Sequence, residues 1–67
     1  MCLSAVYKKT NHQMVKVVAD VARMKASRDG YLFVDLFGNE TFVRGRLQQI
    51  DFVDDNAIVL EESHAPE

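Results

Sequence analysis

The sequence predicts an all-β fold, a small SH3-like or Sm-like barrel of five or six strands. Short segments rich in β-branched and aromatic residues are separated by polar turns about eight to twelve residues apart, a spacing typical of sandwiches and barrels. The alternation of apolar residues also changes face twice, between Val21 and Met24 and between Leu47 and Ile50. Each change predicts a β-bulge of the kind that lets a sheet bend toward closure.

The chain is expected to begin with a β-hairpin. Residues 2–8 are mostly apolar or β-compatible, residues 9–12 form a polar break, and residues 13–26 contain several valines. An amphipathic helix over residues 14–26 is the alternative, but β-branched valines favour a strand. We therefore predict two strands joined by a loop at residues 9–12.

A central strand is predicted over residues 31–37, between two tight turns. The turn before it is Arg28-Asp29-Gly30, where Asp-Gly favours a type I′ hairpin, and the turn after it is Gly38-Asn39. Period-two alternation divides its side chains between two faces, with Leu32, Val34 and Leu36 on one and Tyr31, Phe33, Asp35 and Phe37 on the other.

The remaining residues predict two more extended segments. Residues 40–53 form one long strand-like segment, in which Gly45 allows a sharp bend. A turn at Asp54-Asp55-Asn56 then leads to the apolar residues 57–60, which complete the pattern.

The size of the chain limits its core. At 67 residues the core is marginal by itself, and a single cysteine excludes an internal disulfide. We expect one β-barrel domain over residues 1–62 and a flexible tail over residues 63–67. The second apolar face of the central strand predicts a homodimer whose interface includes Phe33 or Phe37. The alternative is that both faces of this strand are buried within one chain.

Charge and hydropathy restrict the class of partner. Eight Lys and Arg stand against ten Asp and Glu, a formal net charge of −2, which argues against nucleic acid as a partner. No segment approaches the roughly 20 apolar residues of a membrane span, and no apolar leader precedes Lys8 and Lys9, so we expect no membrane association. A free thiol without an export signal predicts a cytoplasmic protein.

No residue constellation typical of an enzyme is visible in the sequence. His12 falls in a predicted loop and His64 in the tail, and neither has a neighbouring nucleophile. The paired carboxylates Asp54-Asp55 and Glu61-Glu62 fit a turn and a solvated strand end. We therefore predict that the protein is not an enzyme and that neither histidine is an essential metal ligand, although either could add a labile one.

Cys2, the single cysteine, is the exception. Its thiolate, its amide nitrogen and the amine of Met1 would close two five-membered chelate rings on one metal ion. Planar N and S donors suit nickel(II) or copper(II), whereas zinc prefers a tetrahedron. One terminus supplies only part of a square plane, so we expect two chains to share one nickel(II) ion through both Cys2 thiolates. The alternative is a small buried residue that opens the first strand.

Several segments form a pattern that extends over about residues 1 to 62. They are Met1-Cys2-Leu3-Ser4-Ala5-Val6-Tyr7, Asp20-Val21-Ala22-Arg23-Met24, Asp35-Leu36-Phe37-Gly38-Asn39-Glu40, Gly45-Arg46-Leu47-Gln48-Gln49-Ile50-Asp51-Phe52 and Ile58-Val59-Leu60-Glu61. In order and spacing they resemble the CooT-type family of nickel-binding proteins.

This resemblance implies a small homodimer that binds nickel through Cys2, with backbone nitrogens of Met1 and Cys2 as co-ligands. It implies a nickel chaperone or carrier for a nickel enzyme such as carbon monoxide dehydrogenase, with a nickel-enzyme maturation protein as a partner. A small-barrel module that binds RNA or protein is the alternative, although interleaved acidic residues count against it. A redox enzyme with an N-terminal nickel hook fits less well, because the hook of nickel superoxide dismutase uses an N-terminal histidine and a second cysteine, which this chain lacks.

Overall fold

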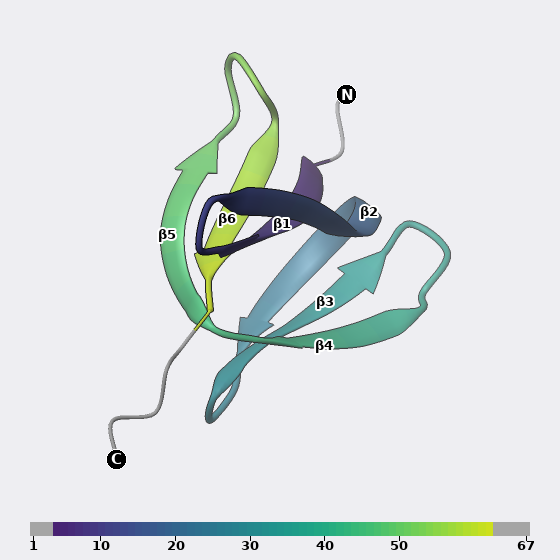
Figure 1. The fold of residues 1–67 in the computed structure, drawn as a ribbon. Coiled ribbons are helices and arrows are strands. Elements are labelled where there is room, and N and C mark those ends of the chain that lie inside the picture. The colour runs from purple at the N-terminus through teal and green to yellow at the C-terminus, as the bar shows by residue number, and fades with distance from the viewer. Residues whose placement is uncertain (1–3, 63–67) are drawn as a thin grey trace.

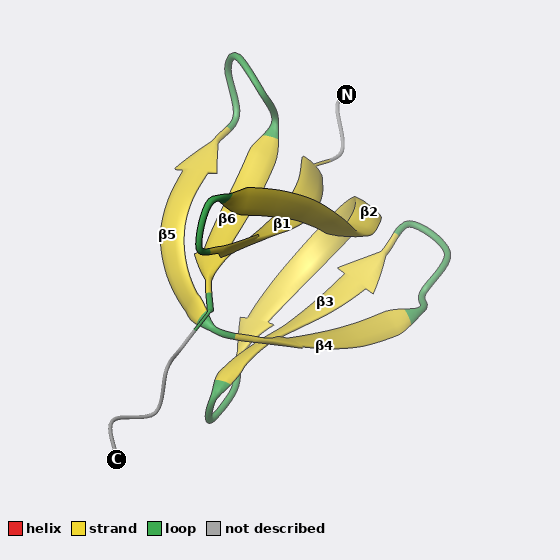
Figure 2. Cartoon of the chain, viewed as in Figure 1, coloured by secondary structure: helices red, strands yellow, loops and turns green. Residues whose placement is uncertain are grey.

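The computed structural model describes residues 4–62, in which it shows six β-strands and no helix. The strands are β1 (Ser4–Thr10), β2 (Gln13–Ala26), β3 (Gly30–Asp35), β4 (Glu40–Arg44), β5 (Arg46–Asp51) and β6 (Ala57–Glu61). The all-β prediction is therefore confirmed with six strands (Figure 2). Residues 13–26 form a strand, as the valines predicted, and not the alternative helix.

All six strands belong to one mixed sheet with the order β4-β3-β2-β1-β6-β5 (Figure 1). Neighbours are antiparallel except β1 and β6, which run parallel and pair Ala5 with Ala57. The sheet bends over its own core, but β4 and β5 remain its two edges. The expected closed barrel is not confirmed, because the chain passes from β4 to β5 at Gly45 and the two strands then pair with β3 and β6 instead of with each other.

Two changes of register lie where the sequence predicts bulges. The pairing of β2 with β3 shifts between Val21 and Arg23, and the pairing of β5 with β6 shifts between Leu47 and Gln49. Both shifts fall inside the intervals in which the apolar pattern changes face, so both predicted bulges are confirmed.

Inside β2, the inward-facing side chains are spaced three residues apart instead of two. Val18 and Val21 are buried, and the half-buried Met24 packs against the same core. Asp20, with φ of 54°, lies between the first two, and the register shift lies between the last two. Each irregularity rotates the strand by one position, so that its apolar side chains follow the bend of the sheet. The N–H of Leu36 donates a hydrogen bond to the carbonyl oxygen of Asp20 at 2.9 Å.

One hydrophobic cluster fills the space inside the bent sheet, with Phe33 at its centre. Every strand except β5 contributes to this cluster of Val6, Val18, Val21, Phe33, Val43, Ile58 and Leu60. Phe33 is 0% exposed, whereas Phe37, in the turn after β3, is 78% exposed. The prediction of a subunit interface on this face is therefore wrong for Phe33, because the bend of the sheet covers its side chain within one chain. For Phe37, the subunit interface stays a prediction.

The turns that the sequence predicts are present, but the one at residues 28–30 differs in kind. Those at residues 9–12, 38–39 and 54–56 connect β1 to β2, β3 to β4 and β5 to β6. Gly30 begins β3 without a positive φ, so the predicted type I′ turn is wrong. A Cβ at Gly30 would overlap the carbonyl oxygen of Val43, so the glycine is required by the close approach of β3 and β4. The predicted bend is present at Gly45, whose φ of 141° separates β4 from β5.

We predict that Phe33→Ala lowers the free energy of unfolding by about 3 to 5 kcal/mol, because it leaves a cavity at the centre of a small core. Phe42→Ala is the matched control, since Phe42 is 49% exposed on the edge strand β4 and should lose about 1 kcal/mol or less. Urea unfolding followed by circular dichroism measures both. Equal losses would show that Phe33 does not hold the two halves of the sheet together.

Candidate metal centre and its surroundings

The residues predicted to bind metal lie outside the part of the chain that the structure describes. Met1 and Cys2 precede residue 4, and His64 follows residue 62. Ser4 is buried and opens β1, which lies between β2 and β6 in the sheet. The candidate metal centre therefore directly precedes a strand that is anchored in the interior of the sheet.

The start of β1 is held from both sides. Ser4 pairs with Val21 in β2, and the N–H of Ala5 donates to the carbonyl of Asn56 at 3.1 Å. Val21 also pairs with Asp35 at the end of β3. The start of β1, the bend of β2, the β3–β4 turn and the β5–β6 loop therefore lie at the same end of the sheet, from which the turn and the loop project in different directions (Figure 1). We call this part of the molecule the entry end.

The β3–β4 turn carries two exposed apolar side chains on a well-ordered backbone. One carboxylate oxygen of Asp35 accepts the N–H groups of Phe37 and Asn39 at 2.9 Å each, and the other accepts the side-chain amide of Asn39 at 3.1 Å. Gly38, with φ of 89°, donates its N–H to the carbonyl of Asp35 at 3.0 Å. Because these groups satisfy one another, Leu36 and Phe37 project into solvent with exposures of 59% and 78%.

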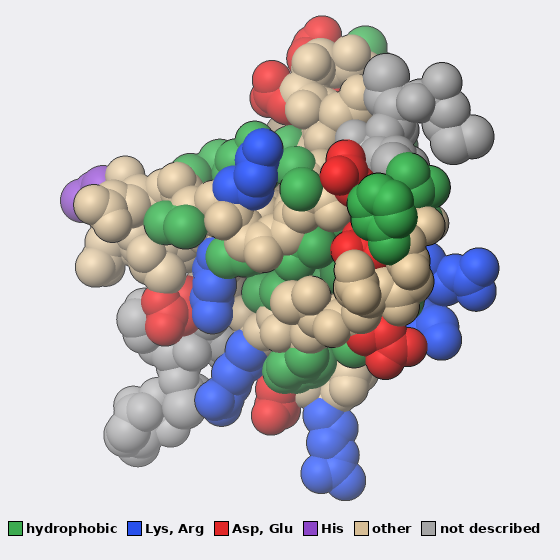
Figure 3. Space-filling view, turned by 90° about the vertical axis from the view of Figure 1, so that its right-hand side faces the viewer, with side chains coloured by type: hydrophobic (Ala, Val, Ile, Leu, Met, Phe, Trp, Pro, Cys, Tyr) green, Lys and Arg blue, Asp and Glu red, His purple; other side chains and the backbone are tan. Residues whose placement is uncertain are grey.

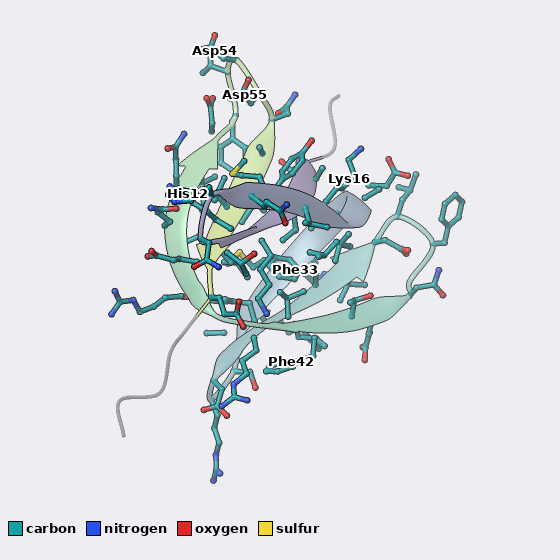
Figure 4. The ribbon with its side chains drawn as sticks, viewed as in Figure 1. His12, Lys16, Phe33, Phe42, Asp54 and Asp55 are labelled. Carbon is teal, nitrogen blue, oxygen red and sulfur yellow. The ribbon has the colours of Figure 1, made fainter. Side chains whose placement is uncertain are left out.

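The β5–β6 loop repeats this arrangement. One carboxylate oxygen of Asp51 accepts the N–H groups of Val53 and Asp54 at 2.9 and 3.0 Å. Phe52 and Val53 are 67% and 88% exposed, and Asp54 and Asp55 lie at the crest of the loop (Figure 4). The carboxylates at the crest are exposed, as the sequence predicted for a turn.

Sequence reasoning predicted both turns but missed the surface that they form. The signal was an aspartate followed by two large apolar residues, Asp35-Leu36-Phe37 and Asp51-Phe52-Val53, each at the end of a strand. A hollow of about 200 Å³ lies beside the second of these segments, lined by Phe52, Ser4 and residues of β2, β5 and β6. The four most exposed large apolar side chains of the described residues therefore belong to the two loops of the entry end.

His12 lies away from the entry end. It is exposed in the β1–β2 hairpin, at the opposite end of β1 from Ser4 (Figure 4). A strand of this length spans about 20 Å, which separates His12 from the start of its own chain's β1. This distance agrees with the prediction that His12 is not an essential ligand, which stays a prediction. Among residues 4–62, no three His, Cys, Asp or Glu side chains are grouped closely enough to hold a metal ion.

Hydrogen bonds lower the pKa of both loop aspartates. Desolvation raises the pKa of Asp35, but the backbone and side chain of Asn39 and the backbone of Phe37 outweigh it, so the pKa lies below the ordinary value of 3.8. The backbone N–H groups of its own loop lower the pKa of Asp51 from the same value, and desolvation opposes them. Both carboxylates are therefore ionised at neutral pH and hold their loops in shape.

The fold and its exposed chemistry define a small all-β protein with one open, bent sheet and an apolar entry end. Nowhere in residues 4–62 is there a helix long and apolar enough to cross a membrane. Residues 1–61 match the sequence model of the family described as CO dehydrogenase accessory protein CooT. The chain therefore belongs to the CooT family, as the resemblance of its sequence predicted.

A solved structure shares the fold. It is the crystal structure of a CooT candidate from Carboxydothermus hydrogenoformans, with a TM-score of 0.83 and 17% sequence identity. The match covers 94% of this chain and 100% of that chain, so the two share the same architecture. No curated protein matches the chain significantly.

We predict that acid releases the two loops of the entry end. The folded-state pKa values of Asp35 and Asp51 are lowered, so their hydrogen bonds stabilise the folded protein above about pH 4 and are lost as the pH falls through the lowered values. The amide signals of Phe37 and Val53 should follow this titration in NMR spectra. Asp35→Asn, which removes the charge and keeps an acceptor oxygen, should abolish the step at Phe37 alone. Midpoints at or above the ordinary value would contradict the prediction.

Proposed function

We propose that this protein is a nickel chaperone or carrier that serves the maturation of carbon monoxide dehydrogenase. The observation that supports it most is the family match, which extends over residues 1–61 and so includes Cys2. In this proposal the protein acts in the cytoplasm, catalyses no reaction, and passes its metal to a nickel-enzyme maturation protein or to the enzyme itself.

The donor set at the chain start suits nickel(II) as cargo. A thiolate and a deprotonated backbone amide are donors that favour square-planar nickel(II). The Cys2 side chain and the nitrogens of Met1 and Cys2 are neighbours along the chain. Because one terminus fills only part of a square plane, we propose that one nickel(II) ion is shared by the Cys2 thiolates of two chains.

The entry end supports a dimer of this kind. The metal-binding segment directly precedes Ser4, and the exposed Phe37 and Phe52 flank the same end. If two entry ends face each other across a two-fold axis, the same contact buries apolar side chains and brings two chain starts together. The dimer interface that we propose therefore contains Phe37 but not Phe33, which is already buried within one chain.

Cys2→Ser tests the metal site. The protein should bind one nickel(II) per dimer with a thiolate-to-nickel charge-transfer band in the near ultraviolet, and Cys2→Ser should remove this band and most of the affinity. Binding should strengthen between roughly pH 6 and 8, because the thiol must lose its proton before it binds the metal. Isothermal titration calorimetry and absorbance, with nickel(II) as the probe, measure both effects.

Two further variants serve as controls for the titration. His12→Ala and His64→Ala should bind nickel(II) as the parent protein does. A peptide tag placed before Met1 should weaken binding, since it converts the terminal amine into an amide. If Cys2→Ser protein binds nickel(II) as tightly as the parent, the proposed metal site is wrong.

Phe37→Ser tests the dimer. Removing an exposed aromatic side chain from the centre of an interface should raise the dimer dissociation constant about tenfold or more. Phe42→Ser is the matched control, because Phe42 is a half-exposed phenylalanine of β4 that lies outside the entry end. Light scattering over a range of concentrations measures the equilibrium. A parent protein that is monomeric at micromolar concentration, with and without nickel(II), would refute the dimer.

A further inference from the structure

A second hollow, of about 330 Å³, lies where the β2–β3 turn meets the corner between β4 and β5. Its lining includes three arginines, Arg28, Arg44 and Arg46. Asp29 is the single carboxylate among the lining residues, and Ser27 is a further polar neighbour. The lining residues therefore carry a surplus of positive charge in a protein whose formal net charge is −2.

The backbone of two distant segments builds this hollow. The N–H of Gly45 donates to the carbonyl of Asp29 at 3.0 Å, which ties the corner to the turn. Gly30 pairs with Arg44 in the ladder between β3 and β4, and it packs so closely on β4 that no Cβ fits there. Gly45, with φ of 141°, turns the chain sharply between Arg44 and Arg46. The arginines are therefore presented by a backbone that is fixed before any ligand arrives.

The charges around the hollow favour a small anion over a long one. Arg46 lies opposite Glu61 in the ladder between β5 and β6, but Glu61 does not line the hollow. A nucleic-acid strand needs a basic stripe that follows several phosphates. Here three of the eight Lys and Arg line the hollow, on a protein with a formal net charge of −2. Figure 3 shows Asp and Glu side chains among the Lys and Arg side chains of one face, which interrupt a basic stripe.

We propose that this hollow binds the phosphate groups of a small phosphate-bearing molecule. Guanidinium groups donate two parallel hydrogen bonds to phosphate oxygens, and several of them around one site match a diphosphate better than a singly charged ion. The hollow lies at the low end of the usual size range for small-ligand sites, about 300 Å³ and upwards. It is formed by segments other than those of the entry end, and the proposal does not depend on nickel binding.

Inorganic pyrophosphate is the probe, titrated into the full chain and followed by NMR and calorimetry at low and at physiological salt. The amide signals of residues 27–31 and 44–46 should shift together, and the affinity should fall as the salt concentration rises. Arg44→Gln and Arg28→Gln should each weaken binding about five- to tenfold, because each removes one charged donor. Two variants are used so that the test still holds if one of them fails to fold.

Arg23→Gln is the matched control, since Arg23 is an exposed arginine of β2 that does not line this hollow. It should leave the pyrophosphate affinity unchanged. An equal loss in Arg23→Gln would show a response to overall charge and overturn the proposal, as would absence of shifts at millimolar pyrophosphate. If a 12-nucleotide oligouridine binds more tightly than pyrophosphate through the same arginines, the proposal of a small ligand is wrong and the hollow binds RNA.

Discussion

The strand β2 has to belong to both halves of one sheet, and the rest of the structure depends on how it does so. Between residues 4 and 62 the chain has no helix to cover a sheet, so the sheet must cover itself. Asp20 and the bulge after Val21 bend β2 enough to face β3 and β4 toward β1 and β6. Phe33 is buried because of this bend, and no second layer of structure contributes to its burial.

The molecule has two surfaces with different side-chain chemistry. At the entry end, aspartate carboxylates accept backbone N–H groups and thereby hold apolar side chains outward. At the β4–β5 corner, glycine residues let the backbones approach closely and thereby hold arginines around a hollow. Hydrogen bonds within the loops position the first surface, and close backbone packing between distant segments positions the second. A chain of this size can therefore present ordered side chains without a second domain.

Local chemistry predicted a large part of the fold, and its errors have a physical cause. The changes of face near Val21 and Leu47 marked true bulges, because a bulge leaves its signature in the apolar pattern itself. The same bulges made a helix over residues 14–26 conceivable, since a doubly bulged strand spaces its inward residues by three, close to the period of a helix. The Asp-Gly pair at residues 29–30 led to the wrong prediction of a type I′ turn for another reason. Its glycine is required by close packing against β4, which is distant in sequence.

By itself, the sequence determined the strands, most of the turns and the membership of the family, and it predicted Cys2 as a metal ligand, because each depends on residues that are neighbours along the chain. Tertiary structure decided which phenylalanine is core and which is surface. Both lie on the same predicted face of one strand, but β3 ends at Asp35, so Phe37 falls in the exposed turn while the bent sheet covers Phe33. It also decided that the sheet stays open and that Arg28, Arg44 and Arg46 line one hollow. These outcomes depend on strand pairing between distant segments, which alternation along a single strand does not specify.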